Sequence, residues 1–162
     1  MKKIIIVRHS KSSWKDLSLG DFHRPLNNRG KTDGPLMSKY LSKTIDNIDF
    51  LHSSSSVRTF ETSKFFRLNI EFKNINYDNN LYHCSANSIL NFIKNYPDKY
   101  NSAMIIAHNP GLTNFINLMT NLTLDNLPTT GILIIDFDCN NWNNISTENC
   151  SLVDLKFPKQ LK

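Results

Sequence analysis

Four side chains that could handle a phosphoryl group stand in three separate parts of the chain. Arg8 and His9 directly follow an apolar run, Arg58 follows a serine-rich stretch, and His108 follows a second apolar run. Arginine grips phosphate through paired, charge-assisted hydrogen bonds. A neutral imidazole can attack phosphorus and carry the phosphoryl group covalently. These residue types therefore indicate phosphate binding, and the two imidazoles add the chemistry of phosphoryl transfer.

Three short buried strands are expected to position these residues. The uninterrupted apolar runs at 4–7 and 103–107 are typical of strands covered on both faces, and 48–51 is a further short strand candidate. Because ligands bind outside the carboxyl ends of such strands, the four side chains should converge at one edge of the sheet. We expect a strongly electropositive pocket there, with no carboxylate among its groups. The flanking cations would offset phosphoryl charge, so that no metal is required.

The remaining segments alternate between helix and strand patterns. We expect helices over 26–41, 57–68, 85–96 and 112–122, and strands over 72–77, 132–137 and 151–157. This alternation predicts an α/β fold, a three-layer sandwich with a mostly parallel central sheet and helices on both faces. One domain should span 1–162. Gly34 and Pro35 are expected to distort or delay the first helix, and Ser85 to cap the third.

Composition narrows the class of protein. The chain has 162 residues and a net charge of +5, with Lys and Arg scattered rather than clustered. Scattered cations argue against a nucleic-acid partner and suit an anionic substrate. No apolar stretch approaches the roughly 18 residues of a membrane span, and the apolar run near the N-terminus is too short for a signal peptide. Three widely spaced cysteines indicate reduced thiols. We therefore expect a cytoplasmic protein with no membrane partner.

A zinc site is the alternative use of the histidines and cysteines. The candidate ligands are His52, His83, Cys84 and Cys139, but structural zinc ligands usually come in closely spaced pairs, which this set lacks. We therefore expect no metal and no cofactor.

Five segments, in order along the chain, resemble one known family. They are the stretches 8–14 (RHSKSSW), 21–30 (DFHRPLNNRG), 53–62 (SSSSVRTFET), 107–111 (AHNPG) and 128–131 (PTTG). Together they are similar to the motifs of the histidine phosphatase superfamily, and most closely to its small SixA-type phosphohistidine phosphatases. The resemblance covers nearly the whole chain and implies a phosphoglycerate mutase-like fold.

The resemblance also assigns roles. It implies that His9 is the nucleophile that becomes phosphorylated, that Arg8 and Arg58 bind the phosphoryl group, and that His108 stabilises it from another side. The same segments supply three candidate substrate-binding residues, Ser12, Arg24 and Asn109.

Two departures from the family pattern affect the chemistry. Ser10 replaces the signature glycine and would be strained if that position required a positive φ. His83 follows Leu81-Tyr82, where many members carry the glutamate that protonates the leaving oxygen. An imidazole leaving group accepts a proton near neutral pH, so a site without this carboxylate should favour N–P over O–P bonds. Alternatively, His83 is itself the proton donor.

These observations predict a metal-independent phosphatase that works through phospho-His9, acting on phosphohistidine of a signalling or carrier protein. A chain of this length leaves little room for a lid, and an open site suits a phosphoryl group on a protein surface. Two alternatives stay open. One is a broad phosphomonoesterase of small phosphate esters, and the other is a non-catalytic module that binds phosphorylated ligands.

Overall fold

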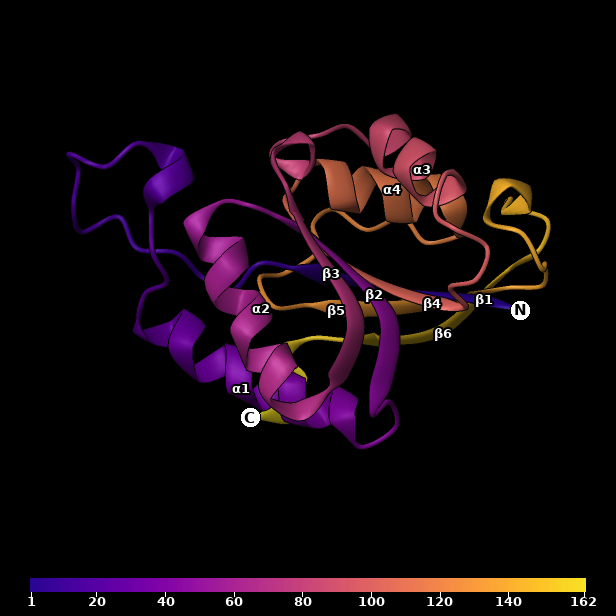
Figure 1. Ribbon diagram of the computed structural model, residues 1–162. Helices are drawn as coiled ribbons and strands as arrows, with labels where there is room; N and C mark the ends of the chain where they lie inside the picture. The colour runs from indigo at the N-terminus through magenta and orange to yellow at the C-terminus, as the bar shows by residue number, and fades with distance from the viewer.

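A six-stranded sheet forms the centre of the molecule (Figure 1). The computed structural model describes residues 1–162. The spatial order is β3-β2-β4-β1-β5-β6, in which β1 to β4 run parallel and β5 is antiparallel to both of its neighbours. The strands are β1 (Lys2–Arg8), β2 (Asn47–Ser54), β3 (Glu71–Asp78), β4 (Ser102–Ala107), β5 (Ile132–Phe137) and β6 (Cys150–Lys156). The predicted mostly parallel sheet is confirmed.

Four helices cover the two faces of this sheet. They are α1 (Asn28–Ser42), α2 (Val57–Asn69), α3 (Ala86–Lys94) and α4 (Gly111–Met119). Figure 1 shows α1 and α2 on one face and α3 and α4 on the other. The predicted α/β sandwich of three layers is therefore confirmed. None of the helices combines the length and the apolar composition that crossing a bilayer requires.

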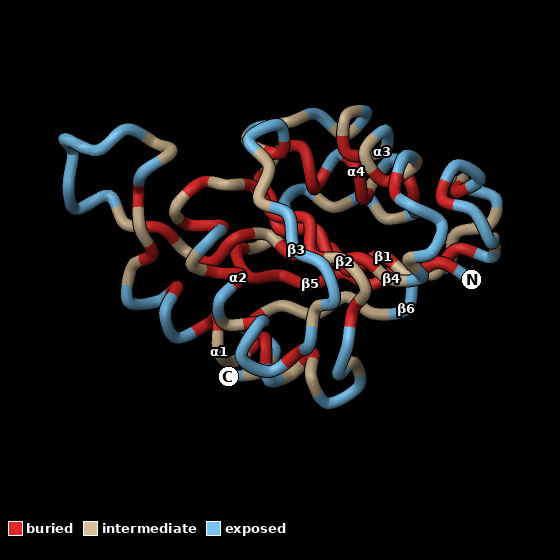
Figure 2. The backbone as a smooth tube through the Cα atoms, in the orientation of Figure 1, coloured by how far each residue is buried: buried red, intermediate tan, exposed pale blue.

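The apolar run of β1 lies between two hydrophobic cores. Ile4 and Ile6 pack in the core beneath α3 and α4, whereas Ile5 and Val7 pack in the core beneath α1 and α2. All four side chains are fully buried, and Figure 2 shows the buried backbone running through the middle of the molecule. Burial on both faces explains why this strand is apolar at every position instead of alternating.

Helix α1 differs from the prediction. The helix is continuous from Asn28 and contains Pro35 in its interior, so the expected delay is wrong. Asn27 caps its N-terminus by accepting a hydrogen bond from the Gly30 amide. A Cβ at Gly34 would lie 2.1 Å from the ring of Phe65 on α2. The close packing of α1 on α2 therefore outweighs the poor helix propensity of the Gly-Pro pair.

Other boundaries differ by a few residues. Strand β2 continues to Ser54, and α4 ends at Met119 instead of 122. The long segment before α1 is mostly irregular, but it contains the 3₁₀ turn Asp21–His23. Ser85 caps α3 as expected, accepting a hydrogen bond from the Ser88 amide.

Candidate active site

Strand register brings the two histidine motifs together. In the parallel pair of β1 and β4, Arg8 lies opposite Ala107. The residues that follow the two strands, His9 and His108, therefore lie at the same edge of the sheet. Their ring centroids are 5.2 Å apart. Strand β2 pairs with the other side of β4 and leads into α2, whose first turn carries Arg58. The predicted convergence at the carboxyl ends of parallel strands is what the structure shows.

A cleft of about 250 Å³ opens at this edge. Every residue that the sequence singled out for the site lines it: Arg8, His9, Ser12, Arg24, Arg58, His83, His108 and Asn109. Four further residues complete the lining: Lys11, Trp14, Asp21 and Thr129.

The His9 ring is held in one neutral tautomer. Its side chain is almost fully buried, and its Nδ1 lies 2.8 Å from the carbonyl oxygen of Ser10. Because a carbonyl only accepts, Nδ1 carries the hydrogen and Nε2 keeps its lone pair. Burial lowers the pKa of His9 to about 3. The positive charges of Arg58 and Arg8 also lower this pKa, whereas the hydrogen bond to Ser10 raises it. His9 is therefore neutral at neutral pH.

Arg58 lies between the two histidine rings. Its Nε is 3.4 Å from Nε2 of His9, and its Nη2 is 3.3 Å from Nδ1 of His108. Since a guanidinium only donates, Nδ1 of His108 accepts and its Nε2 donates to the Ser54 hydroxyl at 2.8 Å. Burial, together with the neighbouring His9 and Arg58, lowers the pKa of His108 to about 2. Both imidazole rings are therefore neutral, and each accepts a hydrogen bond from Arg58.

Arg8 retains donors for a ligand. One of its terminal nitrogens donates to the carbonyl oxygen of Leu127 at 2.9 Å, while its buried Nε has no hydrogen-bond partner. Burial and the charge of Arg58 lower the pKa of Arg8. A buried, incompletely paired guanidinium is stabilised by an anion, because a charged acceptor replaces the lost hydration.

The expectation of a site without a carboxylate is wrong. Asp21 lines the cleft, where its Oδ1 accepts from Arg24 at 2.9 Å and its Oδ2 accepts from Arg58 at 3.0 Å. The Tyr82 hydroxyl also donates to Oδ2. Although partial burial raises the pKa of Asp21, the hydrogen bonds from Tyr82, Arg24 and Arg58 outweigh it and lower that pKa. The carboxylate is ionised and partly neutralises the two guanidiniums.

Sequence reasoning missed Asp21 because the segment before α1 has no periodicity to place it. The available signal was its position three residues before Arg24, in the stretch that carries the family resemblance.

Arg24 belongs to the wall of the cleft. Its guanidinium is buried, donates to the Ser12 hydroxyl at 2.6 Å, and lies 3.6 Å from the centre of the Trp14 ring. Arg24 also forms an ion pair with Asp21 inside the site, which partly neutralises its charge. Ser12 accepts this hydrogen bond and keeps its own hydroxyl hydrogen to donate.

His83 lies at the rim of the cleft. Its side chain is half-exposed and its ring stacks on Tyr82, with centroids 4.1 Å apart. Its Nε2 is 3.4 Å from both the Asp21 carboxylate and Arg58. His83 has a φ of 52°, and this left-handed conformation at the end of the Tyr82 loop is unusual for a residue with a Cβ.

Asn109 lines the cleft but uses its side chain within the protein. Its amide nitrogen donates to the carbonyl oxygen of Leu127 at 3.0 Å and to Asn126, and its oxygen accepts from Thr113. Both amide hydrogens are thereby occupied. Asn109 accordingly supports the wall rather than offering free donors.

Ser10 fits its position without strain. Its φ is not positive, so the requirement that would have disfavoured a side chain is absent. The amide donates to the Thr62 hydroxyl at 2.9 Å, and the Ser10 hydroxyl accepts from Thr130 at 2.8 Å. The residues weighed for zinc do not assemble, since no three His, Cys, Asp or Glu side chains gather as metal ligands.

Comparison with known sequences gives distant relatives. No family model matches the chain. An uncharacterized chloroplast protein of Arabidopsis thaliana is 27% identical over 152 residues, which is 87% of this chain and 69% of the relative. An uncharacterized protein of Mycobacterium leprae is 22% identical, covering 94% of this chain and all of the relative.

Comparison with solved structures identifies the fold. The protein histidine phosphatase SixA in complex with tungstate superposes with a TM-score of 0.81 at 18% identity, over 99% of both chains. A candidate phosphohistidine phosphatase SixA from Agrobacterium tumefaciens gives 0.81 at 21% identity, over 97% of this chain and 99% of the other. A phosphoserine phosphatase variant from Entamoeba histolytica, in complex with phosphoserine, gives 0.68 at 13% identity over both whole chains. The chain thus has the phosphoglycerate mutase-like fold of SixA-type phosphatases, as its motifs predicted.

Proposed function

We propose that this protein is a metal-independent phosphatase that forms a phospho-His9 intermediate and removes phosphate from phosphohistidine of a signalling or carrier protein. The observation that carries the proposal is the neutral His9 ring, whose Nδ1 donates a hydrogen bond to the Ser10 carbonyl. Its Nε2 lies in a cleft lined by arginines and accepts only a long hydrogen bond, from Arg58 Nε at 3.4 Å. The similarity of fold to SixA-type phosphatases supports the same reaction class. The three cysteines are free, which suits a cytoplasmic setting.

In the first step, Arg58 Nε exchanges its long hydrogen bond to Nε2 of His9 for one to a phosphoryl oxygen. Nε2 then attacks phosphorus in line with the leaving imidazole. The new N–P bond forms as the old one breaks, and its electron pair stays on the leaving nitrogen. When the other ring nitrogen of the substrate carries a hydrogen, the imidazole leaves as a neutral molecule and needs no acid. Arg8 and Arg58 offset the charge on the phosphoryl oxygens.

In the second step, water attacks phospho-His9. The N–P bond breaks, its electron pair returns to Nε2, and both hydrogens of the water leave with the product as dihydrogen phosphate. The hydrogen bond from Nδ1 to Ser10 persists throughout, which keeps Nε2 directed at phosphorus. The pocket needs no reorganisation between the two steps, because the same guanidiniums serve both.

The test is phosphate release from a phosphohistidine-bearing protein domain and from an aryl phosphate, with and without a chelator. We expect faster release from phosphohistidine, an acid-labile phosphoenzyme in wild type, and loss of both in His9→Ala. His23→Ala, at an exposed histidine, is the matched control. Release from neither substrate would overturn the proposal, and phosphate binding without a trapped phosphoenzyme would favour the non-catalytic module.

The second candidate is a phosphomonoesterase of small esters with His83 as the acid. The half-exposed His83 beside Asp21 favours it, because an alkoxide leaving group requires a proton. The replacement His83→Gln separates the two functions. Under the second candidate, hydrolysis of an alkyl phosphate falls by roughly 100-fold. Under the first, release from phosphohistidine stays within a few-fold of wild type.

A further inference from the structure

A second cleft, of about 640 Å³, adjoins the active-site cleft. The two share Lys11, Ser12 and Trp14 in their linings. The second cleft continues from these shared residues toward the first turn of α1. A polypeptide whose phosphorylated residue enters the active site can therefore lie with its flanking residues in this second cleft.

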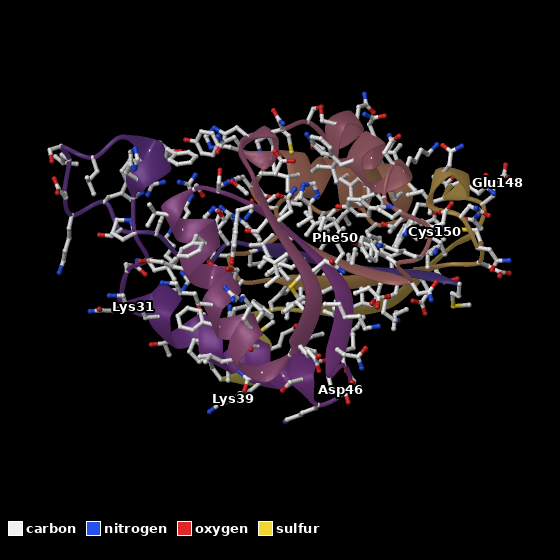
Figure 3. The ribbon with its side chains drawn as sticks, viewed as in Figure 1. Lys31, Lys39, Asp46, Phe50, Glu148 and Cys150 are labelled. Carbon is white, nitrogen blue, oxygen red and sulfur yellow. The ribbon has the colours of Figure 1, made fainter.

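The second cleft is electropositive. Its lining contains four cations, Lys11, Lys15, Arg29 and Lys31, and no Asp or Glu. Arg29 pairs with Asp33 at 3.3 Å, whereas the three lysines have no carboxylate within 4 Å. Figure 3 labels Lys31 at the start of α1, on the side where the loop before this helix extends. Unpaired cations of this density attract a polyanion.

The loop beside this cleft exposes large apolar side chains. Trp14 is 65% exposed and Leu17 is 86% exposed. Figure 1 shows this loop extending from the body of the molecule, and Figure 2 shows it as largely exposed. The Trp14 ring does not lie free, because the buried Arg24 guanidinium covers one face of it at 3.6 Å. Tryptophan and arginine are enriched among the residues that contribute most to protein–protein binding, so this pair suits a protein partner.

We propose that this second cleft docks an acidic segment of the phosphorylated protein, with Trp14 contacting that segment. The proposal deepens the proposed function and rests on it. An acidic polypeptide fits better than a nucleic acid, because single-stranded nucleic acids are bound on several aromatic side chains. Trp14 is the one aromatic residue in this lining.

The test compares two synthetic phosphohistidine peptides that differ only in their flanks, three Asp residues in one and three Asn in the other. We expect wild type to hydrolyse the acidic peptide with a kcat/KM about tenfold higher, mainly through KM. The double variant Lys15→Glu/Lys31→Glu should lose this preference. Its turnover of an aryl phosphate, which does not reach the second cleft, should match wild type.

The matched control is Lys39→Glu/Lys43→Glu. Both lysines are exposed and lie near the other end of α1, where Figure 3 labels Lys39, and the change in net charge is the same. This control should keep the preference for the acidic peptide. Equal losses of this preference in the two double variants would overturn the proposal. Equal hydrolysis of the two peptides by wild type would also overturn it.

Tryptophan fluorescence separates failure of docking from failure of catalysis. The chain has two tryptophans, and Trp142 is fully buried, so a change in emission on adding peptide reports on Trp14. The unphosphorylated acidic peptide should change the emission of wild type and not of Lys15→Glu/Lys31→Glu. This result would hold even if neither phosphopeptide were hydrolysed. Stronger binding of a uridine decamer than of the acidic peptide would contradict the proposal.

Discussion

Asp21 sets the charge of the active site. Its carboxylate accepts hydrogen bonds from both Arg24 and Arg58, so it organises two guanidiniums before any substrate arrives. The same negative charge repels a phosphoryl group in the cleft. Positioning and repulsion therefore act in opposite directions on phosphate affinity, and a variant that keeps the shape of this side chain while removing its charge separates them.

We expect Asp21→Asn to bind inorganic phosphate about three- to 100-fold more tightly, because a unit charge at roughly 6 Å contributes about 0.7 kcal/mol at the dielectric constant of water and about 2.8 kcal/mol near a protein surface. The measurement is the competitive inhibition constant of phosphate against an aryl phosphate. Asp16→Asn is the control, since Asp16 lies on the same loop and lines neither cleft. Weaker phosphate binding in Asp21→Asn would mean that holding the guanidiniums matters more than repulsion.

Ser10, where the related motif has glycine, should stabilise this protein. We expect Ser10→Ala to lower the free energy of unfolding by about 1 kcal/mol, since the Thr130 hydroxyl loses its buried acceptor. Ser10→Gly should lose a further 0.5–1 kcal/mol or so through chain entropy. Turnover should survive in both, because His9 is held by the backbone carbonyl. Urea unfolding measures the order of stability of wild type, Ser10→Ala and Ser10→Gly. A Ser10→Gly variant more stable than wild type would reveal strain at this position.

At the scale of elements, the start of α4 is packed against the loop that carries His83. A Cβ at Gly111 would lie 2.1 Å from the carbonyl oxygen of Cys84. This backbone contact joins the two segments that supply His108 and His83 to the cleft. The active site therefore depends on the absence of a side chain at a residue that itself makes no contact with the cleft.

We expect Gly111→Ala to separate these segments, lowering the free energy of unfolding by about 2 kcal/mol and kcat by roughly 100-fold, as a misplacement near 1 Å does. Turnover of the phosphohistidine domain and urea unfolding provide the two readouts. Gly20→Ala is the control, since a Cβ there meets nothing within 4 Å. Full activity in Gly111→Ala would show that the loop adjusts freely.

The elements that were predictable from the sequence are those defined by local pattern. The apolar runs located β1 and β4, and the rule for carboxyl ends of strands then placed His9 beside His108. Two features depended on distant contacts instead. The continuity of α1 through Pro35 follows from packing on α2, and the position of Asp21 follows from partners far along the chain. Neither leaves a periodic signal.

At the scale of the whole molecule, the fold keeps three histidines buried and uncharged. Burial lowers the pKa of His9 to about 3 and that of His108 to about 2, and it also lowers the pKa of His52 against the opposing effect of Asp78. In the unfolded chain each of them titrates near 6.5. Below that pH the unfolded chain therefore binds more protons than the folded one, and acid favours unfolding.

We accordingly expect the free energy of unfolding to be greatest above pH 6.5 and to fall as the pH drops toward about 3. His9 and His108 each contribute up to about 1.4 kcal/mol per pH unit within this window. Urea unfolding at a series of pH values gives the slope. His108→Gln should reduce this slope by up to about 1.4 kcal/mol per pH unit, the effect of one proton. An unchanged slope in His108→Gln would mean that this ring takes up its proton in the folded protein, with Arg58 moving away from Nδ1 to admit it.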